Sequence, residues 1–136
     1  MIYRSGCWSV VLPPTWHAES YGKVSMLKAD EAIGVLLISS TKFSRTVSDY
    51  DLKKEAWPDI TIQGVNPDEL EPVRLGVLSG FTAKCRKSEP SWQEWWLRYG
   101  SLMISIHGPA TCEAASPEQD AVMSILNSLQ VEESMP

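Results

Sequence analysis

The chain has 136 residues, of which 43% are hydrophobic and 21% are charged, a composition typical of one folded domain and unlike that of a disordered or fibrous chain. Its net charge of −5 would repel a polyanion, and its basic residues are scattered rather than gathered in a patch. Composition and charge therefore argue against a nucleic-acid-binding protein.

The first third of the chain predicts strands joined by short turns. Residues 7–12 are rich in β-branched and aromatic types, and the two prolines that follow end this strand. Residues 15–21 and 23–30 are expected to form a hairpin that turns at Tyr21 and Gly22. The nearly continuous apolar run within 33–43 predicts a central strand that is buried on both faces.

The apolar spacing changes to a helical period between residues 46 and 57. Thr46 or Ser48 can cap the start of this helix, and Pro58 is expected to stop it. Residues 59–72 contain many turn formers and acidic side chains, so they predict a loop or a short strand.

Three extended segments follow, at 72–89, 91–100 and 101–108, and the simplest arrangement for them is an antiparallel meander. Residues 116–131 predict a helix, with Ser116 as the cap and one apolar face that docks on the sheet. That face consists of Ala121, Val122, Ile125, Leu126 and Leu129. We expect one domain over residues 1–131 and a frayed tail at 132–136.

The segment "SWQEWWLRYG" carries large aromatic side chains on both faces if it is a strand. Alternation places Trp92, Glu94, Trp96 and Arg98 on one face and Gln93, Trp95, Leu97 and Tyr99 on the other. A sheet face with large indoles needs cover from a helix, a loop or another molecule. We expect Trp95 to face inward and Trp92 or Trp96 to be available for an outside contact.

The order of these elements resembles the bacterial domains of the Mog/PsbP-like superfamily. The resemblance covers nearly the whole chain, from the opening "WSVVLPPTWHAE" to the closing "AVMSILNSLQV". It implies an α+β fold in which a central antiparallel sheet of about six or seven strands is flanked by helices, as an α/β/α sandwich. It also implies binding roles, as in photosystem accessory subunits, a Ran-binding factor and adaptor or chaperone-like proteins, without a shared catalytic centre.

We therefore expect a non-catalytic protein-binding or adaptor module of bacterial type, with no cofactor. Trp92 and Trp96 would bury their rings against a partner protein, while Glu94 and Arg98 would set the orientation at the rim. Trp16 and Trp57 are further candidates for the same patch. A homodimer formed through this patch is an alternative.

Another alternative is a small thiol-dependent hydrolase that uses His107 and Cys112. No G-x-S-x-G elbow or known cysteine signature surrounds either residue, so the sequence does not favour it. The histidines and the three cysteines also lack the paired spacing of a zinc site.

Compartment and membrane contact are read from the apolar runs and the cysteines. The longest apolar run, at 35–38, is far shorter than the roughly 20 residues of a membrane span. No secretory signal is visible, and an odd number of cysteines fits reduced thiols. These features predict a cytoplasmic protein.

Overall fold

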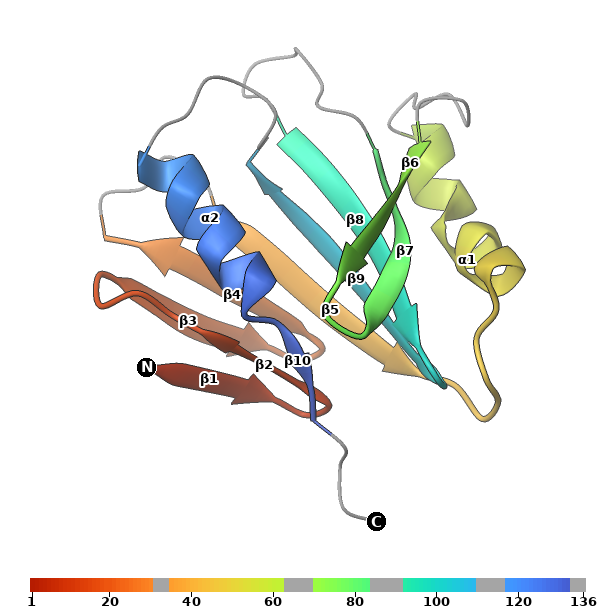
Figure 1. Ribbon diagram of the computed structural model, residues 1–136, viewed down its shortest axis with the longest axis horizontal. Coiled ribbons are helices and arrows are strands. Elements are labelled where there is room, and N and C mark those ends of the chain that lie inside the picture. Colours follow the sequence, from red (N-terminus) through yellow and green to blue (C-terminus); the bar gives the residue numbers. More distant parts are fainter. Residues whose placement is uncertain (31–34, 63–69, 84–91, 110–116, 133–136) are drawn as a thin grey trace.

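The computed structural model describes residues 1–30, 35–62, 70–83, 92–109 and 117–132. Two antiparallel sheets and two helices make up this part of the chain, so the fold is predominantly β (Figure 1). The large sheet has seven strands in the order β3 (Trp16–Tyr21), β4 (Val24–Ala29), β5 (Leu36–Lys42), β9 (Leu102–Pro109), β8 (Trp92–Tyr99), β7 (Leu78–Ala83) and β6 (Leu70–Leu75). The small sheet has three strands in the order β1 (Ile2–Ser5), β2 (Trp8–Val11) and β10 (Gln130–Val131).

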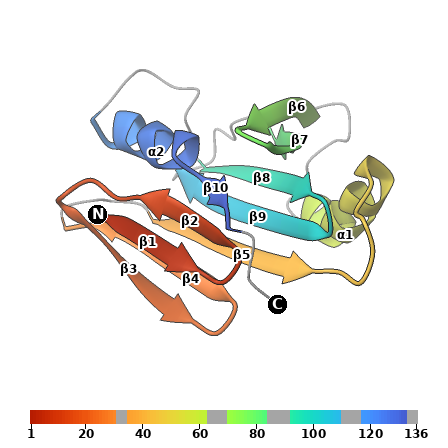
Figure 2. The same ribbon diagram turned by 60° about the horizontal axis from the view of Figure 1, so that its bottom comes forward.

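The expected antiparallel sheet of six or seven strands is confirmed, but the expected α/β/α sandwich is not. Helix α2 (Pro117–Asn127) shares its face of the large sheet with the small sheet, and helix α1 (Asp49–Ile62) packs against the opposite face. The two helices lie on opposite sides of β8 and β9 (Figures 1 and 2). The layers therefore differ from those expected. Strands β1, β2 and β10 form a second sheet, which covers part of the face that helices alone were expected to cover.

Glycine turns define the hairpins. Gly22 joins β3 to β4 and Gly100 joins β8 to β9, as the sequence predicts, and both adopt positive φ angles of 63° and 59°. Two further hairpins were not foreseen. Gly6 separates β1 from β2, and Gly76 divides the single strand expected at 72–89 into β6 and β7.

The main core lies between the large sheet, α2 and the small sheet. Trp95 and Leu97 of β8 point into it together with Val122 and Ile125 of α2 and Trp8 of β2, and all five are buried. The predicted inward orientation of Trp95 is therefore confirmed, as is the docking face of the C-terminal helix. This helix ends at Asn127 rather than at residue 131, so Leu129 joins the core from the segment between α2 and β10. The predicted Ser116 cap lies outside the described residues.

Helix α1 begins where the sequence indicates and ends later. The backbone N–H of Asp51 donates to the Ser48 hydroxyl at 3.1 Å, and the Ser48 N–H donates to the Asp51 carboxylate at 3.0 Å. This reciprocal cap confirms Ser48 and excludes Thr46. The stop expected at Pro58 is wrong, since the helix continues to Ile62 with Pro58 inside it. Proline removes one backbone hydrogen bond and strains a turn, but a helix held by packing can continue past it.

Candidate functional site

Trp96 does not lie on the surface. Its side chain is only 1% exposed and its ring centre lies 5.3 Å from that of Phe81, in a second core cluster. The other buried members of this cluster are Ala83 of β7 together with Val47, Leu52 and Ala56 from α1 and the segment before it. The face that alternation assigns to Trp96 is thus covered by α1, and Trp96 cannot contact a partner in this structure.

Trp92 is half-buried and stacks on His107, with ring centres 5.7 Å apart and planes inclined by 23°. His107 lies on β9 directly opposite Glu94 on β8, and its Nδ1 is hydrogen-bonded to the Glu94 carboxylate. Glu94 is buried, which corrects its expected place at an exposed rim. Of the predicted aromatic patch, Trp92 therefore keeps an accessible surface, and Glu94 orients the histidine beneath it.

Arg98 joins the sheet to α1. Its Nε donates to the Asp49 carboxylate at 2.7 Å, and its Nη1 donates to the Val47 carbonyl at 3.3 Å. The hydrogen bond from Arg98 lowers the pKa of Asp49 below its usual value. Since Arg98 is engaged in this way, its observed contacts fix the start of α1.

The remaining two tryptophans lie in different environments. Trp16 is 4% exposed and belongs to the main core, so it is not available for binding. Trp57, on α1, is 52% exposed. Trp57 therefore remains accessible, whereas Trp16 is a packing residue.

A sheet face that the sequence did not reveal lies next to Trp92. The register aligns Glu94, His107, Leu37, Met26 and Glu19 in one row across five strands. The next row contains Trp96, Ser105, Ser39, Val24 and Tyr21. The middle of these two rows forms what we call the open face, composed of Val24, Met26, Leu37, Ser39, Ser105 and His107.

The apolar members of the open face are only partly buried. Val24, Met26 and Leu37 pack in neither core cluster, and the described helix on this side of the large sheet, α1, packs against β8 rather than against β4 or β5. The Ser39 and Ser105 hydroxyls are hydrogen-bonded to each other at 2.7 Å. The expectation that β5 is buried on both faces is therefore wrong, because α1 covers the β7–β8 end of this side and leaves the β4–β5 end open.

The His107–Glu94 pair predicts a pH-dependent stability. The hydrogen bond to Glu94 raises the pKa of His107 above 6.5, against the opposing effect of partial burial. A histidine with a raised pKa in the folded state contributes stability below its unfolded pKa and loses that contribution as pH rises through the folded pKa. We expect urea denaturation over roughly pH 5 to 9 to show this fall in the free energy of unfolding. His107→Gln should flatten this part of the profile, whereas a His17→Gln control should leave it; an unchanged profile in His107→Gln would contradict the assignment.

The described residues show neither the thiol site expected for a hydrolase nor a metal site. Cys112 lies outside them, so the proposed pair with His107 is not tested. Among the described side chains, no group of three His, Cys, Asp or Glu residues could hold a metal ion. The described helices are also too short or too polar to cross a bilayer.

Comparisons with known proteins bear on the fold alone. No protein-family profile matches the sequence, and no curated protein matches it. A solved structure from Bacteroides thetaiotaomicron VPI-5482 is similar in fold, with a TM-score of 0.62 and 13% sequence identity. The similarity covers 93% of this chain and 45% of the other, so this chain spans less than half the length of that neighbour.

Proposed function

We propose that this protein is a non-catalytic binding or adaptor module, of the Mog/PsbP-like type, that receives an apolar segment of a partner protein on the open face. The observation that supports this proposal is the partial exposure of Val24, Met26 and Leu37 on the paired strands β4 and β5. Apolar groups on a preformed surface bind with little loss of conformational entropy, which favours their use in recognition. We place this activity in the cytoplasm.

The predicted patch residues then divide into two roles. Trp92 borders the open face beside His107 and would contact the partner. The other three residues would act indirectly. Trp96 and Arg98 hold α1 against the sheet, and Glu94 orients His107. The partner surface is thus shifted from the α1 side of β8 toward β5 and β4.

Leu37→Glu should weaken partner binding at least about tenfold, since it places a charge in the middle of the apolar contact. The matched control is Val77→Glu, at an apolar side chain that is 55% exposed in the β6–β7 turn. Affinity capture from the host lysate, followed by mass spectrometry, would compare the wild type with both variants. Both variants should keep a free energy of unfolding within about 1 kcal/mol of the wild type.

Proteins captured equally by wild type and Leu37→Glu would contradict the proposed surface. Light scattering over a concentration series identifies the case in which the partner is a second copy of this chain. In that case Leu37→Glu should shift the protein toward the monomer, and Val77→Glu should not.

A further inference from the structure

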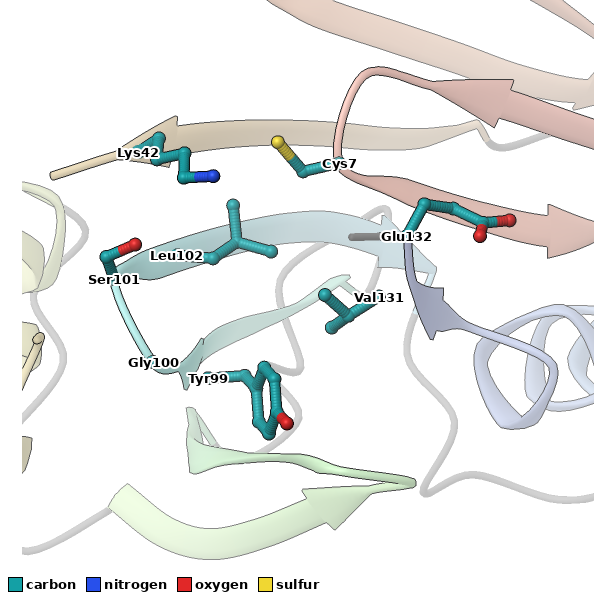
Figure 3. Close-up of a pocket in the computed structure, with 8 residues that line it drawn as sticks. All are labelled: Cys7, Lys42, Tyr99, Gly100, Ser101, Leu102, Val131 and Glu132. Atoms are coloured by element: carbon teal, nitrogen blue, oxygen red, sulfur yellow. The ribbon is translucent and has the colours of Figure 1, made fainter. Parts of the chain in front are cut away.

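A surface pocket lies between the two sheets, on the opposite side of the large sheet from the open face. It is a pocket of about 310 Å³ at the end of β5, β8 and β9. Its floor is one cross-strand row, in which Leu102 pairs with Tyr99 on one side and with Lys42 on the other (Figure 3). Leu102 is buried at the base of this floor, whereas Tyr99 is 41% exposed and gives the floor a surface that solvent can reach.

The other wall comes from the small sheet. Cys7, in the turn between β1 and β2, and Val131 of β10 line the pocket opposite Leu102. The Glu132 N–H donates to the Cys7 carbonyl at 2.7 Å, and the Phe43 N–H donates to the Ser101 carbonyl at 2.8 Å. Backbone hydrogen bonds therefore hold both walls, and the pocket exists before any ligand binds.

Among the described residues, the lysine that lines the pocket has no counterion. Figure 3 shows the Lys42 ammonium and the Cys7 sulfur directed into the pocket, while the Glu132 carboxylate is turned away from it. That carboxylate pairs with the Arg4 guanidinium at 3.3 Å. Within the described part of the chain, Lys42 has no hydrogen bond or ion pair, so its charge is available to an anion.

We propose that this pocket binds a small organic carboxylate, with the carboxylate on Lys42 and the apolar body over Leu102 and Val131. A volume of about 310 Å³ is at the lower end of the range for small-molecule sites, which are mostly apolar with a few placed polar groups. One ammonium suits a monoanion, whereas phosphate sites usually supply several donors. This site is independent of the function proposed for the open face.

Cys7 provides a local readout, because a molecule in the pocket covers its sulfur. The probe is hexanoate, and the measurement is the rate at which iodoacetamide alkylates Cys7, followed by mass spectrometry of the peptide that contains it. Hexanoate should slow this reaction in a saturable manner in the full chain. Lys42→Met should raise the concentration needed for half protection about three- to fivefold, as expected for one partly exposed ion pair.

Hexanamide is the matched neutral probe, and it should protect the wild type about as weakly as hexanoate protects Lys42→Met. A free cysteine peptide alkylated in the same solutions controls for effects on the reagent. Equal protection of wild type and Lys42→Met by hexanoate, or no protection of Cys7 at all, would overturn the proposal. Neither result would affect the Leu37→Glu experiment, which concerns the other face of the sheet.

Discussion

Trp96→Ala should lower the free energy of unfolding by about 3 to 5 kcal/mol, the range for removing a large aromatic side chain from a core. The ring is 1% exposed and packs on Phe81 beneath α1. Alanine would leave a cavity bounded by the sheet on one side and Leu52 on the other, and neither side can close it without losing other contacts. Urea denaturation followed by circular dichroism would measure the loss.

Two variants show whether burial causes this loss. Trp57→Ala removes the same side chain from an exposed site on α1 and should cost less than about 1 kcal/mol. Trp96→Phe should destabilise the protein less than the lost side-chain volume implies. The Trp96 indole N–H is buried and has no hydrogen-bond partner among the described residues, and phenylalanine removes that donor. A loss in the free energy of unfolding below about 1 kcal/mol for Trp96→Ala would show that the Trp96 ring is not part of a packed core.

Alternation within β8 could be predicted from sequence, but which of its faces α1 covers could not. Trp95 and Trp96 are adjacent, so the period of two sends them to opposite sides, as the structure shows. Both sides of such a strand look apolar, and the sequence contains no local signal for the contact between β8 and residues 47–56. The prediction therefore assigned Trp96 to a partner that proves to be the chain's own helix.

The small sheet was missed for a related reason. Strand β10 has two residues, and its pairing with β2 joins positions more than 120 residues apart, as in the pair Gln130 and Ser9. Such a pairing leaves no periodic pattern over so short a stretch. The pocket wall formed by Cys7 and Val131 depends on it, so the candidate carboxylate site could not be found without the fold.

The sequence of β5 contains a signal for the open face, but it was interpreted as a sign of burial. The apolar run that includes Leu37 predicted a strand covered on both sides, and the structure covers one of them. An apolar residue that faces neither core contributes little to the fold, but a group of such residues indicates a surface that contacts another molecule. The excess apolar character of β5 is therefore the sequence feature that best anticipates the proposed function.

Gly80→Ala should destabilise the protein by more than about 3 kcal/mol, toward the upper end of the cost of overpacking. A methyl group at this position would lie 1.9 Å from the Trp96 carbonyl oxygen and 3.0 Å from the Leu97 Cα. Both atoms belong to the backbone of β8, which pairs with β7 through Gly80 and Leu97, so they cannot rotate away. The same methyl group would lie 3.0 Å from the Leu52 side chain of α1.

Gly108→Ala is the matched control in the same sheet. Its methyl group would lie 2.4 Å from Leu36 Cδ2, the end of a side chain that can change rotamer, so we expect a cost of about 1 to 3 kcal/mol. Thermal unfolding of the two variants under identical conditions would rank them. If Gly80→Ala costs no more than Gly108→Ala, β7 can separate from β8 without much penalty. In that case α1 can change its position on the sheet. The backbone then does not fix the boundary between the covered and the open part of this sheet face.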